Sequence, residues 1–224
     1  MPSKNTFSAK SKTPLFKGAF VRVFEDTAEI DKKTGEKSWR LVAILPKGSD
    51  ISGINAAIKD AAEKNWGKKT ELTMKHKNFK HPIKTGDEFR RREDGELYTG
   101  FAEDDICFKI GSKSKAPGIV DRLARVIASE DGATLIDKKN DVYDIVDTNR
   151  VYSGCYFFAT FTAMAWEHED GANGVSLLLE NLQLVKQGES LGGGGSGGGA
   201  RDASSDFGVV EGADADDLSN LLGV

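Results

Sequence analysis

The stretch RVYSGCYFFATFTAMAW, residues 150–166, is the strongest strand signal in the chain. It is rich in aromatic and β-branched residues and is longer than an ordinary strand, so we expect a bend or bulge near Gly154. A turn-like EHEDGANG follows, and VSLLLENLQLVKQGE, residues 175–189, is predicted to return as its partner. A long hairpin is therefore the central element of the predicted fold.

The two faces of this strand differ, because successive side chains of a strand point to opposite sides. On a barrel, one set lies inside and the other outside. The apolar set, which we place inside, is Cys155, Phe157, Ala159, Phe161, Ala163 and Ala165. The other set carries Tyr156, Phe158 and Trp166, which we place outside or on the wall of a groove. Exposed rings require a partner, which is either stacked nucleic-acid bases or a covering helix or subunit.

Three further strands are predicted from shorter patterns. Residues 15–24 and 38–45 form a hairpin whose loop is loaded with lysine. A third strand lies within residues 96–112 and places Ile106, Phe108 and Ile110 on one face. The segment 119–150 is acidic and irregular, so we expect only short elements there.

One helix is predicted over residues 48–67, with its regular part at about 50–66 and with Ser49 or Asp50 as its N-cap. Trp66 near its end is assigned to the core. The basic tract 68–94 has no clear periodicity and is expected to be a long loop or ribbon. Strands around one helix fit a small closed barrel better than a parallel sheet, so the fold class is mainly β.

Four segments follow from composition. Residues 1–13 are expected to form a flexible basic arm, and residues 14–190 the folded domain. Residues 191–205 are a Gly/Ser-rich linker, which also matches the linkers that protein engineers use, and residues 206–224 are an acidic tail. We treat the linker as native and expect the tail to be disordered.

The net charge of −4 hides a strong asymmetry. Residues 1–92 carry 21 Lys and Arg against 11 Asp and Glu, whereas residues 93–190 carry 9 against 18. The last 34 residues carry 1 against 6. A basic N-terminal portion and an acidic tail are typical of nucleic-acid-binding proteins, although solvated surface charge alone would give the same pattern.

Cysteine content and hydropathy indicate a cytosolic protein. Cys107 and Cys155 are the only cysteines, which favours two reduced thiols over a disulfide scaffold. No apolar run approaches the roughly 20 residues of a membrane helix, and no secretory signal precedes the body. We therefore expect no membrane partner.

Cations on loops and exposed rings together predict a DNA-binding surface, since lysine and arginine neutralise phosphates and rings stack on bases. The candidate DNA-binding residues are Lys32, Lys33, Lys37, Trp39, Arg40, Lys75, Lys77, Lys80, Arg90, Arg91, Arg92, Tyr98, Phe101, Tyr152, Tyr156, Phe158 and Trp166.

Signatures of catalysis are weak, so we expect no enzyme, no catalytic residue, no metal and no cofactor. WGKKT resembles only the end of a phosphate loop, and the three histidines lack metal-ligand spacing. Glu103, Asp104 and Asp105 leave open a metal-dependent nuclease or another DNA-processing enzyme. A virion structural protein is a further alternative.

The order of the motifs LVAILPKGSD, VYSGCY and NGVSLLLENLQLVKQGESLGG resembles a family of bacteriophage single-stranded DNA-binding proteins, over roughly Leu15 to Gly193. The resemblance implies an OB-fold with a long excursion and sequence-independent binding of single strands. It also implies a role in phage DNA replication or recombination, in the cytoplasm of the infected bacterial host. A homo-oligomer is possible within such a family.

Such families also end in an acidic tail that recruits replication proteins, here a polymerase, helicase or primase. From its charge and the reach of the linker, we expect that the tail also competes with DNA. Family tails often finish with an aromatic residue, whereas this chain ends in Leu-Leu-Gly-Val. The candidate docking residues are Phe207, Asp214, Asp216, Asp217, Leu218, Leu221 and Leu222.

Overall fold

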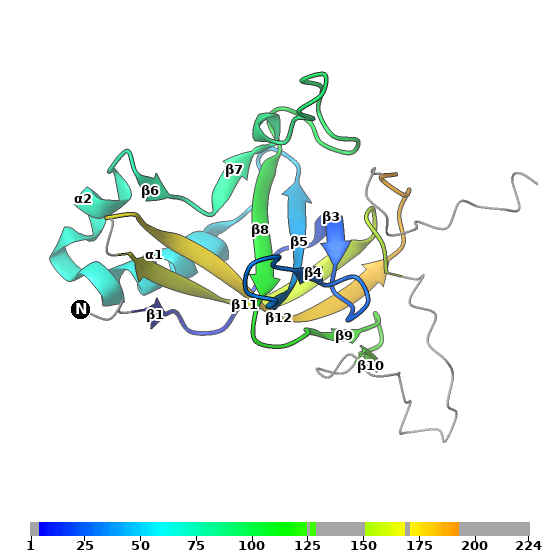
Figure 1. Cartoon of the computed structure of the whole chain (residues 1–224), viewed down its shortest axis with the longest axis horizontal. Coiled ribbons are helices and arrows are strands. Elements are labelled where there is room, and N and C mark those ends of the chain that lie inside the picture. Colours follow the sequence, from blue (N-terminus) through cyan, green and yellow to red (C-terminus); the bar gives the residue numbers. More distant parts are fainter. Residues whose placement is uncertain (1–4, 125, 129–150, 169–170, 193–224) are drawn as a thin grey trace, which may run out of the picture.

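A long, curved β-ribbon runs through the body of the computed structural model, which describes residues 5–124, 126–128, 151–168 and 171–192 (Figure 1). Two helices are described, α1 (Ser52–Trp66) and α2 (Thr70–Met74), with 3-10 turns at Gly67–Lys69 and Gly86–Glu88. The strands are β1 (Thr6–Phe7), β2 (Ser11–Lys12), β3 (Phe16–Arg22), β4 (Glu29–Ile30), β5 (Lys37–Leu45), β6 (Phe79–Lys80), β7 (Ile83–Thr85), β8 (Ile106–Ser112), β9 (Gly118–Val120), β10 (Val126–Ala128), β11 (Tyr156–Glu167) and β12 (Asn173–Lys186).

Five of these strands close a barrel. They pair in the order β11, β3, β5, β8 and β12, and β12 pairs with β11 again to complete the ring. All ring pairings are antiparallel except β8 with β12, which is parallel. The expected small, mainly β, OB-fold-like barrel with one main helix is confirmed.

The barrel interior is built from the alternation predicted for residues 155–165. Cys155, Phe157 and Phe161 are completely buried, whereas the alternate side chains of β11, such as Tyr156 and Phe158, are only partly buried. Phe157 packs on Phe16 with ring centroids 5.9 Å apart. A Cβ at Gly18 would lie 2.7 Å from the Phe157 ring, so a glycine on β3 makes room for this ring. The inward and outward assignment of the strand is confirmed.

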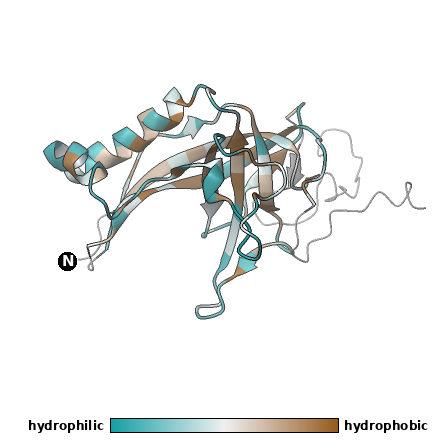
Figure 2. Cartoon of the chain, turned by 90° about the horizontal axis from the view of Figure 1, so that it is seen from above, coloured by the Kyte–Doolittle hydropathy of each residue, from teal (hydrophilic) through white to brown (hydrophobic). Residues whose placement is uncertain are grey.

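Helix α1 lies along β11 and covers the core with its apolar stripe (Figure 2). The stripe consists of Ile54, Ala57, Ile58, Ala61 and Ala62, all buried. Trp66 is partly buried and packs edge-on against Phe79 at 5.9 Å, which confirms its assignment to the core.

The predicted N-cap of α1 is wrong. Ile51 occupies the cap position, and no side chain caps the helix there. Ser49 instead donates its hydroxyl to the carbonyl of Pro46 at 2.7 Å, and Asp50 accepts from the Ser52 N–H at 2.8 Å. Both side chains therefore stabilise the turn that leads into the helix, because the helix begins later than the sequence pattern indicates.

The N-terminal segment lies on the barrel from residue 5 onward, rather than forming a free arm along its described part. β1 and β2 both pair with β11. Thr13 fixes the segment on β11, because its N–H donates to the Ala159 carbonyl and its hydroxyl accepts from the Ala159 N–H, each at 2.9 Å. The Thr6 hydroxyl donates to the Ala61 carbonyl of α1 at 3.0 Å. The segment thus connects helix and barrel.

Residues 68–105 form the long excursion, which contains more structure than expected. α2, β6 and β7 occupy its first part, and a hairpin with an Arg90–Leu97 bridge projects beyond them (Figure 1). Its base covers the outer face of β3, β5 and β8 and creates a second apolar cluster there. The buried members of this cluster are Ala19, Val42, Ile44, Phe89, Phe101, Cys107 and Leu191.

Leu191 is assigned by sequence to the linker, yet its side chain is buried in this second cluster. Its N–H donates to the Ser153 carbonyl at 2.9 Å. Gly100 adopts a φ of +89°, and any Cβ there would collide with the Leu191 side chain. The packed body therefore includes residue 191.

Most of the expected irregular segment 119–150, and the linker and tail from residue 193 on, lie outside the described residues. Within the described part of the chain, no helix is long and apolar enough to cross a membrane.

Candidate nucleic-acid interface

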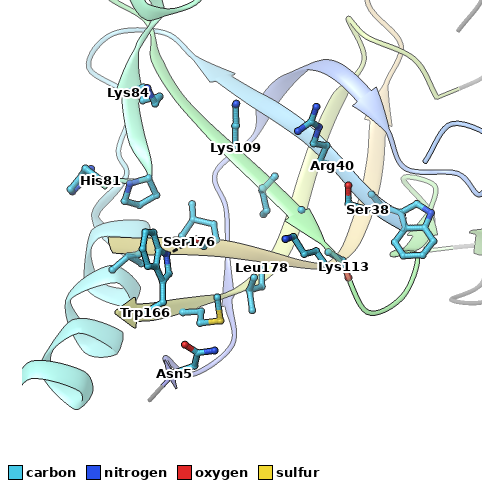
Figure 3. Close-up of a pocket in the computed structure, with 18 of the residues that line it drawn as sticks. Asn5, Ser38, Arg40, His81, Lys84, Lys109, Lys113, Trp166, Ser176 and Leu178 are labelled. Atoms are coloured by element: carbon cyan, nitrogen blue, oxygen red, sulfur yellow. Dashed lines mark hydrogen bonds between the residues drawn. The ribbon is translucent and has the colours of Figure 1, made fainter. Parts of the chain in front are cut away.

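A groove of about 540 Å³ lies on the outer face of the barrel, over β5, β8, β12 and the end of β11 (Figure 3). The connection between β6 and β7 forms part of its rim. Its principal polar, charged and aromatic lining residues are Asn5, Ser38, Trp39, Arg40, His81, Lys84, Lys109, Ser112, Lys113, Trp166, His168 and Ser176.

The groove floor follows from strand register. Arg40 on β5 pairs with Gly111 on β8, and Gly111 pairs in turn with Leu178 on β12. Side chains opposite one another in adjacent strands share a face, so Arg40 and Leu178 flank a position that has no side chain. A Cβ at Gly111 would lie 2.8 Å from the Trp39 carbonyl oxygen. Because Gly111 has no side chain, the floor of the groove is recessed between Arg40 and Leu178.

Four cationic side chains line the groove, and they differ in their partners. Arg40 pairs with Glu29 at 2.6 Å, and Lys84 pairs with Glu88. Lys109 and Lys113 are exposed, and neither forms an ion pair with any carboxylate of the described residues. Figure 3 shows Lys109 and Arg40 projecting from adjacent strands on the same side. Uncompensated positive charge in the groove thus comes mainly from Lys109 and Lys113.

Asp31 is a carboxylate in the turn between β4 and β5, which neighbours the groove. The backbone N–H groups of Thr34 and Lys33 hold the pKa of this carboxyl below its usual range, with a smaller contribution from Lys113. The carboxylate accepts from the Lys33 N–H at 2.7 Å and from the Thr34 N–H at 3.0 Å. Asp31 therefore serves to fix the turn that carries Lys32 and Lys33.

Trp166 supplies the aromatic wall of the groove. Its indole Nε1 donates to the Ser176 hydroxyl at 3.0 Å, which fixes the orientation of the ring (Figure 3). His168 contacts the ring, with centroids 4.9 Å apart. The indole is half-buried, so part of it is accessible from the groove. A fixed, partly exposed indole beside lysines is suited to stacking against a nucleic-acid base.

Among the predicted DNA-binding residues, the structure brings Trp39, Arg40 and Trp166 to this groove. The Trp39 side chain is only 7% exposed, and its Nε1 has no hydrogen-bond partner among the described residues. Lys80 is exposed on β6, which pairs with the start of β12 beside the groove. Lys32 and Lys33 lie exposed on the β4–β5 turn, and Lys37 at its base pairs with Glu25.

Phe101 and Tyr98 do not form the exposed stacking surface expected for them. Phe101 is buried in the second cluster and stacks on Phe89 with centroids 4.9 Å apart. Tyr98 is partly buried and meets Phe20 edge-on at 5.0 Å. These rings cover the outer face of β3, β5 and β8, because the excursion folds back over that face.

Tyr152 also has a packing role. Its hydroxyl donates to the Gly188 carbonyl at 2.8 Å, and the ring packs against the barrel core. Burial is the main cause that raises the pKa of this phenol above its ordinary value. The Tyr152 ring thus joins the chain before β11 to the chain after β12.

The arginine run of the excursion is largely compensated by carboxylates. Arg90 pairs with Glu103 at 2.7 Å, and Arg91 pairs with Asp94 at 3.0 Å and also with Glu96. Arg92 is exposed at the tip of the hairpin, and Lys75 and Lys77 are exposed in the segment after α2. None of these five cations lines the groove.

Tyr156 and Phe158 lie at the opposite end of β11 from Trp166. Each ring has a lysine over it, Lys186 at 4.5 Å from the Tyr156 centroid and Lys12 at 4.1 Å from the Phe158 centroid. The rings predicted to form one surface are therefore divided between two regions.

Sequence reasoning missed Lys109, Lys113, Lys84 and the groove histidines. The strand alternation that places Phe108 and Ile110 inside also places Lys109 outside, so a signal for this lysine was present. The carboxylates considered for a nuclease are engaged elsewhere: Glu103 with Arg90, Asp104 with Lys47 at 3.2 Å, and Asp105 with the Ala102 N–H at 2.7 Å. In the described part of the chain, no three His, Cys, Asp or Glu side chains gather as a metal site.

A closed five-stranded barrel with one main helix and a cationic and aromatic groove over β5, β8 and β12 has the architecture of an OB-fold. The chain belongs to the family described as Enterobacter phage Enc34, ssDNA-binding protein, whose model matches residues 10–219.

The sequence identity to individual relatives is low. Protein p50 of Acyrthosiphon pisum secondary endosymbiont phage 1 is 27% identical over 180 residues, which cover 79% of this chain and 83% of that protein. The single-stranded DNA-binding protein of bacteriophage Enc34, solved in complex with ssDNA, is 16% identical with a TM-score of 0.48, covering 82% of this chain and 89% of that one. The bacteriophage T7 single-stranded DNA-binding protein gp2.5 is 13% identical with a TM-score of 0.44, covering 94% and 97%.

Proposed function

We propose that this chain is a non-enzymatic protein that binds single-stranded DNA without sequence preference, in the groove over β5, β8 and β12. The observation that carries the proposal is the placement of the unpaired Lys109 and Lys113 and the oriented Trp166 around one groove on the barrel. Membership of the family of phage ssDNA-binding proteins supports it.

The chemistry of the groove suits a flexible anionic strand. Lys109 and Lys113 would neutralise phosphates directly, whereas Arg40 and Lys84 would first exchange a carboxylate partner for a phosphate. A base stacked on Trp166 needs no particular hydrogen-bond pattern, because every base has a π-face. Binding should therefore depend on strand exposure and salt more than on sequence.

Direct measurement of oligo-dT binding by fluorescence at rising salt tests this function. Two to four neutralised phosphates give a slope of log K against log salt between about −1.4 and −2.8 for a single strand. Duplex DNA of the same length, whose bases cannot reach Trp166, should bind more weakly. Absence of single-strand binding at low salt, with the tail removed as well, would refute the proposal.

We further propose that the acidic tail recruits phage replication proteins and competes with DNA for the cationic groove, in the cytoplasm of the host during replication or recombination. The support is compositional: the last 34 residues carry 6 acidic side chains and end in apolar residues. A Gly/Ser-rich linker of 14 residues, 192–205, would have an r.m.s. reach of about 20 Å. A tethered acidic segment acts at an effective concentration near mM.

Removal of Arg201–Val224 is expected to tighten single-strand binding by about fivefold in buffer of about 0.02 M salt, and by little above about 0.3 M, because salt screens the competing charges. The measurement is a set of oligo-dT titrations across salt. A full-length control with Asp214, Asp216 and Asp217 changed to asparagine should show part of the same gain. Equal affinities for the whole and shortened chains at every salt concentration would contradict competition but would leave DNA binding intact.

A further inference from the structure

The far end of the β11–β12 hairpin carries a second group of rings and cations, outside the groove. Tyr156 and Phe158 come from β11, Lys12 from β2, Lys17 from β3 and Lys186 from β12. None of these five residues lines the groove. We call this surface the Tyr156 face.

Strand register places these side chains together. Tyr156 pairs with Lys17 on one side and with Lys186 on the other, so a ring lies between two lysines in a row across three strands. Lys12 lies over the Phe158 ring at 4.1 Å. A Cβ at Gly188 would lie 2.9 Å from the edge of the Tyr156 ring, so a glycine lets the chain after β12 pass close to it. The arrangement is built from four separate strands.

The positive charge of this face is uncompensated within the described residues. Lys12, Lys17 and Lys186 form no ion pair with any carboxylate there. The neighbouring Lys10 is different, because it pairs with Glu180, which also accepts from the Thr162 hydroxyl. This neutral cluster lies between the Tyr156 face and the groove.

We propose that the Tyr156 face is a second contact for single-stranded DNA, on the path of a strand that leaves the groove; this rests on the proposed function. Free lysines beside rings are the pair of groups that single-strand binding requires. In the DNA-free chain each ring has an ammonium group over it. A base stacks on an aromatic ring more strongly than an exposed ammonium binds it. The base therefore displaces the lysine, whose ammonium then contacts a phosphate.

The separation of the two surfaces fixes the length of DNA that would engage both. Trp166 and Phe158 are eight residues apart on β11, about 26 Å at about 3.3 Å per residue. A strand covers this distance with about 8 nucleotides at the duplex spacing of about 3.4 Å, and with fewer when extended. A dT oligomer of about 5 nucleotides would occupy the groove alone, whereas one of about 20 would reach both surfaces.

Changing Lys12, Lys17 and Lys186 to glutamate in the full chain should lower affinity for the longer oligomer at least about tenfold and for the shorter one less than about twofold. The salt slope with the longer oligomer should fall in magnitude by about 2, for three lost phosphate contacts at about 0.7 each. The matched control changes Lys59, Lys68 and Lys69, exposed on α1 and the turn after it, to glutamate. This control variant has the same net charge as the variant of the Tyr156 face. It should lower the affinity for both oligomers equally and weakly.

A ring substitution tests stacking separately from charge. Phe158→Leu keeps an apolar side chain on the sheet but removes the ring, and should weaken only the longer oligomer, by several-fold. Tyr156→Phe keeps a ring and should bind both oligomers as the wild type does. Circular dichroism and thermal melting check that each variant is folded.

Several results would overturn the inference while leaving the groove intact. Equal losses with both oligomers, or losses no larger than those of the control, would mean that the face does not contact DNA. Tighter binding of the longer oligomer by the glutamate variant would assign the face to the acidic tail. If the glutamate variant differs from the wild type in molecular mass by light scattering, the Tyr156 face would instead be assigned to contact with a second copy of the chain. If the wild type binds neither oligomer, the proposed function itself fails.

Discussion

A chain carrying both Trp166→Ala and Lys109→Glu is expected to bind oligo-dT about 100-fold more weakly than the wild type in buffer of about 0.05 M salt. Loss of one stacked base accounts for about 1–3 kcal/mol, and reversal of one unpaired cation removes a phosphate contact and adds repulsion. The two residues lie on different strands of the same groove, so both losses act on one bound strand. Fluorescence titration with a labelled oligomer gives the ratio of dissociation constants.

Two controls separate binding from folding in this experiment. Trp166→Phe retains a ring and should recover most of the stacking, although it loses the hydrogen bond to Ser176. Lys69→Glu changes an exposed lysine outside the groove and should alter affinity by less than about threefold. Wild-type affinity in the double variant, with an unchanged melting temperature, would show that DNA binds elsewhere on the chain.

Phe157→Ala is expected to lower the free energy of unfolding by about 3–5 kcal/mol, which is a large share of the stability of a single domain. The Phe157 ring is completely buried in the core of the barrel and packs on Phe16. Its removal leaves a cavity that the closed ring of strands cannot easily collapse, because neighbouring strands are fixed by their hydrogen bonds. Denaturation in urea, followed by circular dichroism, gives the difference.

The adjacent Phe158→Ala provides the matched comparison, since the same ring is removed one residue along the strand. Phe158 is only partly buried on the outer face, so its loss should cost about 1 kcal/mol or less. Similar destabilisation by both substitutions would contradict the assignment of inward and outward faces on β11.

Local periodicity is the reason that the long hairpin and α1 could be predicted from sequence. The alternation from Cys155 to Trp166 has the period of a strand, and one face is wholly apolar. Such a pattern depends only on which side of the sheet meets the core. The helix likewise shows its stripe from Ile54 to Ala62, although its N-terminus could not be placed correctly because turn and cap residues are of the same types.

The second cluster could not be predicted in this way. Phe89 and Phe101 lie in a segment without periodicity, and they are buried because the excursion returns over the outer face of the barrel. From sequence alone, Arg90 and Arg91 indicate a basic patch, because the sequence does not show that the hairpin brings carboxylates close to them. Ion pairing and loop packing are tertiary properties, so residue types alone did not distinguish a free cation from a compensated one. Lys109, in contrast, follows from strand alternation.

Leu191 also determines how mechanical load would pass from the tail to the body. A partner that pulls on the segment after Gly192 would act first on the Leu191 side chain against Gly100, and on the hydrogen bond from its N–H to Ser153. Leu191 follows β12 in the chain, so tension from the tail would load its contacts with the excursion and with the turn before β11 before it reached the end of β12 at Lys186. The pairing of β12 with β11 and β8 would thereby be shielded from a force applied beyond Gly192.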